Sequence, residues 1–216
     1  MISGVRADAF LETLGPEKCL TARKAAMRDI PAILDLINGY AAVGILLART
    51  EFEMSEALRD FTVVTLNKEF LGCGALHFYG PTCGEIRSLA VHERAKTKGV
   101  GRKLVEALVR EAQQYELDAV FAFTSVAEFF RKVGFHVVER GVLPLKVWKD
   151  CLRCPKFQSC DEVAVLRVLR PDRWLESHPS LRGLFGPDDQ FIQLPYHGRR
   201  RKYPQNGDSF RARKRL

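Results

Sequence analysis

A short apolar strand that leads through a glycine turn into a helix is the feature that most constrains this chain. The strand covers residues 85–91, EIRSLAV, the turn covers residues 96–101, KTKGVG, and a helix is predicted for residues 101–115. The first N–H groups of a helix are unpaired and carry partial positive charge, so they attract phosphate. Glycines at positions 99 and 101 let the backbone approach that phosphate without an intervening side chain. The segment therefore predicts a phosphate-binding loop between a strand and a helix.

Length and composition favour one ordinary globular domain with extensions. The chain has 216 residues, of which 46% are apolar and 28% charged, as in an average soluble domain with a full core. No apolar run approaches the roughly 20 residues that a membrane span needs. Charges interrupt the first 20 residues, which therefore lack the apolar stretch of a signal peptide. We expect a cytoplasmic protein with no membrane contact.

The net charge of +8 comes mainly from the end of the chain. Residues 199–216 hold eight Lys or Arg against one acid, Asp208, and carry +7. With Tyr203 and Phe210 between the basic runs, this tail could contact nucleic acid or an acidic partner. The composition after Leu169, rich in Pro, Gly, Arg and Asp, favours instead a solvated segment with little fixed structure.

The apolar periods predict eleven elements in the order β-α-α-β-β-β-α-β-α-β-β. Asp29 is expected to cap the first helix, Asn67-Lys68-Glu69 to form a hairpin turn, and Gly134 to end the last helix. The elements are predicted at residues 20–23, 29–37, 52–59, 61–66, 70–78, 85–91, 101–115, 119–124, 126–133, 135–139 and 162–169. We divide the chain into an N-terminal extension (1–18), a domain (19–169) and a basic, flexible tail (170–216).

The glycine turn resembles the pyrophosphate-binding signature of the GCN5-related N-acetyltransferases, Arg/Gln-x-x-Gly-x-Gly/Ala. Lys96 stands at the first position, which keeps a donor but loses the planar fork of arginine. Residues 129–135, FFRKVGF, resemble the family's Phe-Tyr-x-Lys-x-Gly-Phe, except that Phe130 replaces the tyrosine that often protonates the departing thiolate. The resemblance covers residues 20–169. It implies the α/β (α+β) fold of that family, a mixed central sheet flanked by helices, and acetyl-CoA as cofactor.

Within that family, the chain is most similar to amino-acid acetyltransferases of the N-acetylglutamate synthase type. Those proteins combine a Glu-x-x-x-Leu-Ala-Val strand, a Leu-Thr-type strand end and an aromatic-Phe-Arg-x-x-Gly-Phe helix exit; here residues 85–91, 121–125 and 129–135 follow in that order. Residues 143–151, LPLKVWKDC, resemble short members without an amino-acid-kinase domain. The resemblance implies acetylation of L-glutamate in arginine synthesis, by direct attack in a ternary complex.

Two other functions stay open. The same fold could acetylate another amine, such as another amino acid, an antibiotic or a protein N-terminus. Alternatively, the chain could be a non-catalytic acetyl-CoA sensor or nucleic-acid-binding adaptor. An amino-acid substrate is the expected partner, and a homodimer stays open. The resemblance implies cofactor contacts from Leu89, Ala90, Val91, Lys96, Lys98, Gly99, Val100, Gly101, Arg102 and Phe130.

Candidate catalytic groups follow from the chemistry of acetyl transfer. The substrate ammonium must lose a proton, and the resemblance places Glu85 as the general base, with His92 as a rival. Glu85 could alternatively end a hairpin in solvent. A backbone amide near Leu89 or Ala90 would stabilise the tetrahedral intermediate. Thr124 or Ser125 would donate a hydrogen bond to the thiolate, unless the hydroxyl caps the next helix, for which Ser125 fits a capping box.

Recognition of carboxylates favours arginine. Arg87 shares a strand face with Glu85, because residues two apart point the same way; a cross-strand ion pair is the alternative. Arg131, Lys146 and Arg153 are further candidates for substrate binding, or else solvated charges.

The six cysteines are expected to be reduced thiols, since nothing indicates secretion. Cys151, Cys154 and Cys160 are close in sequence and suggest zinc. Zinc normally takes four ligands, and the fourth would have to come from Asp161, His136 or elsewhere. The spacing does not fit the iron–sulfur patterns. We expect thiols that pack a loop, and no metal.

Overall fold

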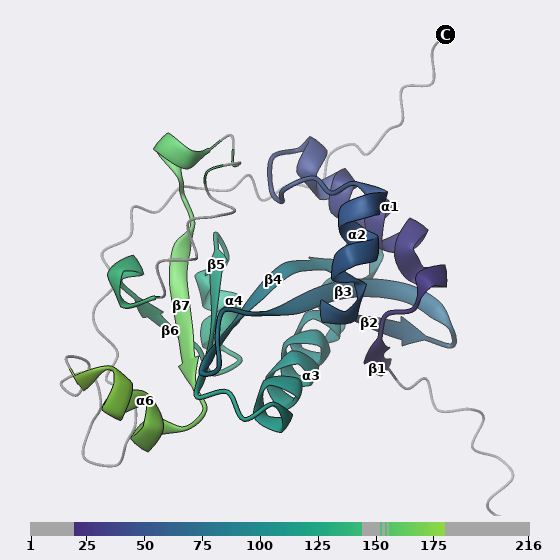
Figure 1. Ribbon diagram of the computed structural model, residues 1–216. Helices are drawn as coiled ribbons and strands as arrows, with labels where there is room; N and C mark the ends of the chain where they lie inside the picture. Colours follow the sequence, from purple (N-terminus) through teal and green to yellow (C-terminus); the bar gives the residue numbers. More distant parts are fainter. Residues whose placement is uncertain (1–19, 144–151, 153, 155, 180–216) are drawn as a thin grey trace, which may run out of the picture.

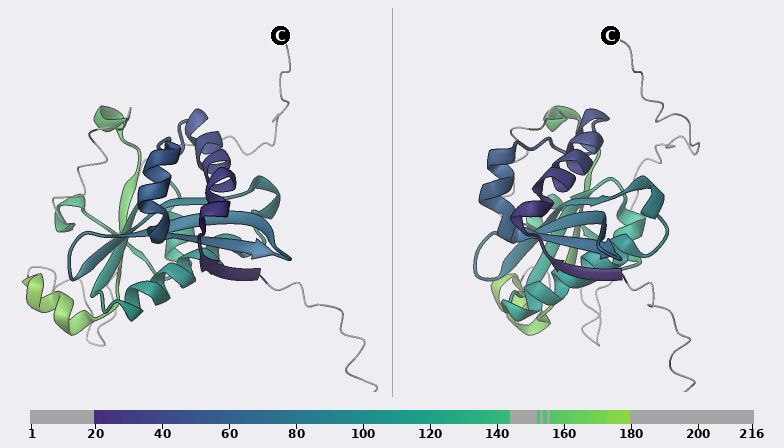
Figure 2. Two further views of the ribbon diagram at one scale, coloured as in Figure 1. Left: turned by 45° about the vertical axis from the view of Figure 1, so that its right-hand side comes forward. Right: turned by 90° about the vertical axis from the view of Figure 1, so that its right-hand side faces the viewer.

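In the computed structural model, the described residues, 20–143, 152, 154 and 156–179, form a seven-stranded sheet with helices on both faces (Figures 1 and 2). The sheet has the order β1-β2-β3-β4-β5-β7-β6. Its strands are β1 (Leu20–Lys24), β2 (Phe61–Leu66), β3 (Glu69–Phe78), β4 (Cys83–Val91), β5 (Ala119–Thr124), β6 (His136–Val138) and β7 (Val163–Val168). Only β4 and β5 pair in parallel; every other pair is antiparallel.

Two pairs of helices cover opposite faces of the sheet. Helices α1 (Ile30–Ala42) and α2 (Glu51–Ala57) lie on one face, and α3 (Val100–Gln114) and α4 (Ala127–Arg131) lie on the other (Figures 1 and 2). The element order predicted from the sequence is confirmed, as is the mixed sheet flanked by helices.

The β2–β3 connection is a tight hairpin, as predicted. Asn67 and Lys68 both have positive φ, 49° and 69°, which is the backbone that a two-residue type I′ turn requires. This turn matches the twist of the strands on either side. It also sets their register, in which Leu66 stands opposite Glu69.

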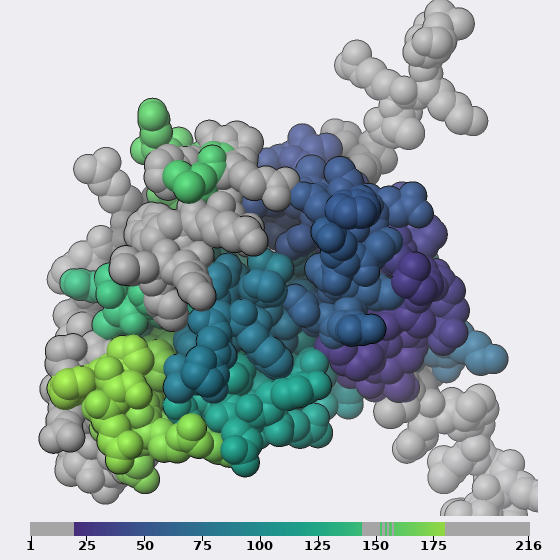
Figure 3. All heavy atoms as spheres, viewed as in Figure 1, coloured from purple at the N-terminus to yellow at the C-terminus, as the bar shows by residue number. Residues whose placement is uncertain are grey.

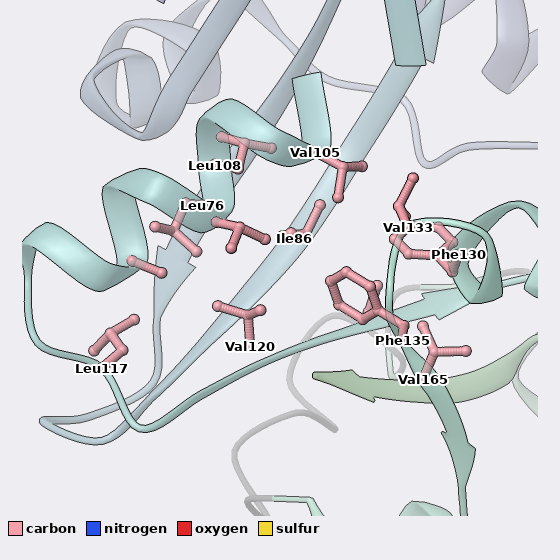
Figure 4. Packing of buried hydrophobic residues seen from close by; sticks show 13 residues of the cluster. Leu76, Ile86, Val105, Leu108, Leu117, Val120, Phe130, Val133, Phe135 and Val165 are labelled. Atoms are coloured by element: carbon pink, nitrogen blue, oxygen red, sulfur yellow. The ribbon is translucent and has the colours of Figure 1, made fainter. Parts of the chain in front are cut away.

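The core between α3 and the sheet explains why α3 is amphipathic. Val105 and Leu108 are fully buried on the face of α3 that meets Ile86 of β4 and Val120 of β5 (Figure 4). Burying one such side chain contributes about 1.5–3 kcal/mol. This packing fixes the position of the N-terminus of α3 relative to β4.

Asp29 stands at the N-cap of α1. The prediction that it caps this helix is wrong for its side chain, because the carboxylate makes no capping hydrogen bond to α1. It accepts hydrogen bonds from Arg23 Nη1 and Nη2 at 2.7 and 2.8 Å and from the Ala26 amide at 2.7 Å. The hydrogen bond from Arg23 holds the pKa of Asp29 below its usual value. The carboxylate thus ties β1 to the start of α1.

The expectation of little fixed structure after Leu169 is wrong for residues 171–177, which form helix α6 (Pro171–Ser177). Trp174 is fully buried against Phe121 and Leu166, and the Asp118 carbonyl accepts the Leu169 and Arg170 amides at 2.7 and 3.0 Å. In the space-filling view, α6 forms the yellow-green lower left part of the molecule (Figure 3). The division into residues 1–18, 19–169 and 170–216 stays a prediction, since residues 1–19 and 180–216 lie outside the described part. None of the helices in the described ranges has the length and apolar character that a bilayer crossing requires.

Candidate functional site

Strands β4 and β5 run side by side for only three residues and then separate (Figure 1). Residues 83–85 pair with residues 119–121, while β5 continues beside β7 as far as Thr124. The backbone edge of residues 86–91 that faces β5 therefore has no strand partner within the described part of the chain. Unpaired main-chain donors and acceptors on such an edge can hydrogen-bond to an extended ligand.

A bulge in β4 lies within residues 86–91, which pair with β3 along their other edge. Cys73 pairs with Ala90 and Ala75 with Arg87, so β4 contains one extra residue there, and Ser88 has φ +51°. The His92 amide donates to Leu71 of β3 at 2.8 Å. Because ladder amides alternate in direction along a strand, those of Leu89 and Val91 face away from β3, toward the opening.

The glycine turn leads directly into α3. Gly99 has φ +80° and forms the N-cap without a side-chain hydrogen bond, and Thr97 also has positive φ, +64°. The first helical bond runs from the Lys103 amide to the Gly99 carbonyl at 2.9 Å. The amides of residues 100–102 come before this bond and have no carbonyl partner within the helix. They are therefore available to donate to an anion.

The start of α3 is packed against α4. A Cβ on Gly101 would lie 3.2 Å from Cζ of Phe129, so the second glycine is needed for a close approach of two helices. Arg102 Nη2 donates to the Lys132 carbonyl at 3.2 Å. Phe130, a candidate cofactor contact, is only 3% exposed and packs edge-to-face on Phe129 and Phe135. Phe130 is therefore a residue of the hydrophobic core.

Lys96 is held as a cation beside the turn. Its Nζ lies 2.7 Å from Glu93 Oε2 and 5.4 Å from the centre of the Tyr40 ring. Partial burial lowers the pKa of Lys96, but the hydrogen bonds to Glu93 and Tyr40 outweigh it, and the pKa is raised from its ordinary value. Tyr40 also donates to the Val91 carbonyl at 2.7 Å, which fixes the end of β4. Lys98 and Arg102 are exposed.

Glu85 is buried at the point where β4 and β5 separate. It is 8% exposed and stands opposite His77 of β3 and Phe121 of β5. The alternative that Glu85 ends a hairpin in solvent is therefore wrong. The rival base His92 follows the other end of β4, roughly 20 Å farther along the strand at about 3.3 Å per residue.

Thr124 ends β5 in a buried position, 6% exposed. Its Oγ1 accepts the Val126 amide at 3.0 Å, and this bond does not use the hydroxyl hydrogen. Ser125 is exposed, and the capping box predicted for it is wrong, because α4 begins after Val126 without a side-chain cap.

Two arginines adjoin the bulge in β4, one of which the sequence did not suggest. Arg87 precedes Ser88 and lies 3.9 Å from Asp60 Oδ2. Arg49, in the connection between α1 and α2, donates from Nε to Ser88 Oγ at 3.2 Å, and its backbone is held by two hydrogen bonds to Asn38 at 2.9 and 3.0 Å.

Of the other candidates for substrate binding, the structure describes only Arg131. Arg131 lies on α4 and pairs with Glu128 at 2.8 Å. Lys146 and Arg153 lie outside the described residues.

Four of the six cysteines are described, and all four are free thiols as predicted: Cys73, Cys83, Cys154 and Cys160. Burial raises the pKa of both Cys73 and Cys83 to about 12, so neither is a nucleophile at neutral pH. Arg140 Nη2 donates to Cys160 Sγ at 3.0 Å. Cys151 lies outside the described residues, and no three His, Cys, Asp or Glu among those described are arranged to hold a metal.

Comparison with known proteins identifies a family, relatives and solved structures that this chain is similar to. Residues 35–135 match the model of the acetyltransferase (GNAT) family. An uncharacterised N-acetyltransferase of Chlorobaculum tepidum is 39% identical over 147 residues, which are 68% of this chain and 95% of that protein. The amino-acid acetyltransferase of Mycobacterium tuberculosis is 34% identical, over 64% of this chain and 81% of the relative. N-acetylglutamate synthase from Neisseria gonorrhoeae, solved with coenzyme A and N-acetyl-glutamate, aligns with a TM-score of 0.64 at 28% identity, over 72% of this chain and 36% of that one.

Proposed function

Because this chain belongs to the acetyltransferase (GNAT) family and is thus an N-acetyltransferase, we propose that it transfers the acetyl group of acetyl-CoA to the amino group of L-glutamate. The observation that carries the proposal is the separation of β4 from β5 beside the N-terminus of α3. The Mycobacterium tuberculosis relative is named an amino-acid acetyltransferase, and the Neisseria gonorrhoeae structure contains coenzyme A and N-acetyl-glutamate. Both names support an amino-acid acceptor, and the second supports glutamate and a place in arginine synthesis.

The donor would be bound mainly by backbone groups. The amides of residues 100–102 at the start of α3 suit a pyrophosphate, and Lys96, Lys98 and Arg102 add positive charge around it. The unpaired edge of β4 suits the amide-containing arm of coenzyme A, which can add to a strand edge. The amide of Leu89, beside the bulge, would then donate to the thioester oxygen as charge develops on it.

The chemical step would need a base, an amide donor and a hydrogen-bond donor for sulfur. Glu85 would take the proton from the substrate ammonium, directly or through water, so that the amine attacks the thioester carbonyl. As the tetrahedral intermediate collapses, the C–S bond breaks, the nitrogen loses its second proton to water, and the coenzyme A thiolate takes a proton from water. Thr124 would donate a hydrogen bond to the departing thiolate while its oxygen accepts from the Val126 amide.

The acceptor carboxylates would be bound by Arg49 and Arg87. Arg87 directly precedes Ser88 at the bulge of β4, and Arg49, from the connection between α1 and α2, donates to Ser88 Oγ. Guanidinium groups bind carboxylates through two parallel hydrogen bonds. A substrate with two carboxylates matches two arginines better than a monocarboxylate or a polyamine does.

The test is thiol release from acetyl-CoA by the full chain, with each common amino acid and a polyamine panel as acceptors. We expect turnover selective for glutamate, and a loss of about 10²–10⁴-fold in kcat for Glu85→Gln, with the circular dichroism spectrum unchanged. Turnover with another amine only would keep the N-acetyltransferase and discard glutamate. Binding of acetyl-CoA without turnover would instead favour the sensor or adaptor.

Contact of the basic tail with nucleic acid stays a prediction, since residues 180–216 lie outside the described part. A salt-dependent affinity for DNA or RNA would support the adaptor. The cytoplasmic location and the homodimer likewise stay predictions.

A further inference from the structure

His77 of β3 and Glu85 of β4 stand directly opposite each other on the antiparallel ladder. Such residues share a face of the sheet, with Cβ atoms about 4.5–5.5 Å apart. The imidazole is therefore a close neighbour of the carboxylate that we propose as the base.

Asp60 orients the His77 ring. Asp60 ends the short 3-10 helix η3 (Leu58–Asp60), and its Oδ2 lies 2.8 Å from His77 Nδ1. An ionised carboxylate only accepts hydrogen bonds, so Nδ1 carries the hydrogen and Nε2 keeps its lone pair. The same carboxylate stays in contact with the ring while Nε2 holds a transferred proton.

His77 is more open to solvent than Glu85. Its side chain is 36% exposed and that of Asp60 is 30% exposed, whereas Glu85 is 8% exposed. The charged and titratable groups around the imidazole are Asp60 from η3, Glu85 and Arg87 from β4, and Tyr79, whose ring lies edge-on at 5.1 Å. Arg87 lies 3.9 Å from Asp60 Oδ2, so the Asp60 carboxylate contacts both the imidazole and a guanidinium.

We propose that His77 receives the proton that Glu85 removes from the substrate ammonium and releases it to water. This inference rests on the proposed function. Glu85 takes one proton as the amine forms, and the carboxylic acid passes it to His77 Nε2. The imidazolium, paired with Asp60, then gives the proton to solvent, so both groups return to their starting states.

The test uses the full chain and compares His77→Ala with His178→Ala as a matched control. His178 stacks on Trp174 at 3.9 Å, at the end of α6, so its variant should keep wild-type turnover. For His77→Ala we expect kcat to fall about 10²-fold, within the usual range for a proton-transfer group, with KM for acetyl-CoA unchanged. Added imidazole should restore turnover, and the restored rate should follow the fraction of unprotonated imidazole as pH changes.

Asp60→Asn provides a second, milder variant. It keeps the imidazole but removes the carboxylate that fixes the Nδ1 hydrogen, so kcat should fall by less than in His77→Ala. Wild-type turnover by His77→Ala, or a loss that imidazole does not restore in a folded variant, would overturn the inference. An inactive wild-type chain would instead discard the proposed function, so the two failures are distinguishable.

Discussion

Gly101 of α3 packs against the ring of Phe129 on α4: a Cβ atom there would lie 3.2 Å from Cζ and 3.3 Å from Cε2, so the ring or the helix would have to yield by a few tenths of an ångström. For Gly101→Ala we expect the start of α3 to shift away from α4. Because the amides of residues 100–102 move with it, the Kd for acetyl-CoA should rise about tenfold, or about 1.4 kcal/mol. Isothermal titration calorimetry measures this.

Gly39→Ala is the matched control for that substitution. Gly39 lies within α1, and an added Cβ would meet nothing within 4 Å. Alanine should raise the free energy of unfolding by about 0.5–1 kcal/mol and leave the Kd unchanged. Equal Kd values for the two variants would contradict the role given to the packing of Gly101.

Substitutions of Lys96 and of Glu93 should change the Kd for acetyl-CoA in opposite directions. Lys96→Ala removes a cation from the turn, so the Kd for acetyl-CoA should rise, by about tenfold for a loss of about 1.4 kcal/mol, and depend less on salt. Glu93→Gln removes the carboxylate that Lys96 contacts at 2.7 Å and should lower the Kd. If both variants weaken binding equally, Lys96 acts through the structure of the loop and not through its charge.

Asp29 gives the fold a defined sensitivity to acid. Its pKa is lowered in the folded protein, chiefly by the hydrogen bond from Arg23. The stabilisation is therefore complete above the ordinary carboxyl pKa of about 3.9 and is lost as pH falls through the lower folded value. Asp29→Asn should lower the free energy of unfolding by about 1.5–3 kcal/mol at pH 7, and by less in acid. Urea unfolding at both pH values checks this, and a loss independent of pH would contradict it.

Trp174 should make α6 part of the cooperative fold. A large core residue replaced by alanine costs about 3–5 kcal/mol, so Trp174→Ala should lower the melting temperature strongly. A chain ended after residue 169 should lose stability similarly, whereas a chain ended after residue 179 should not. Scanning calorimetry on the three proteins decides the matter, and equal stability of both truncated chains would show that α6 adds nothing.

Sequence patterns predicted most of the fold because its elements have strong local signals. The alternating and helical periods located every strand of the described sheet, and Asn67-Lys68 marked the hairpin. Helix α6 was missed because only two of its residues, Trp174 and Leu175, pack on the core, in a segment whose composition is otherwise typical of disorder. Two adjacent apolar residues produce no helical periodicity.

The candidate site was harder to predict because its residues meet only through the tertiary fold. Glu85 and the glycine turn belong to one contiguous motif. Arg49 is in a helix connection without any periodic pattern, and it reaches Ser88 only because α1 and α2 pack over β4. His77 and Asp60 are 17 residues apart and meet because the β2–β3 hairpin returns the chain to the same edge. For His77, the available signal was a histidine in an apolar strand, two residues before Tyr79.

The separation of β4 from β5 after three paired residues affects how the acceptor specificity of such a protein can evolve. Most of the groups proposed to bind acetyl-CoA are backbone amides, which every amino acid except proline supplies. Side chains around the acceptor can therefore be exchanged while the donor is still held in place. One scaffold of this kind can acquire new acceptors by replacing a few surface arginines and loops, and the chemistry it performs on them stays the same.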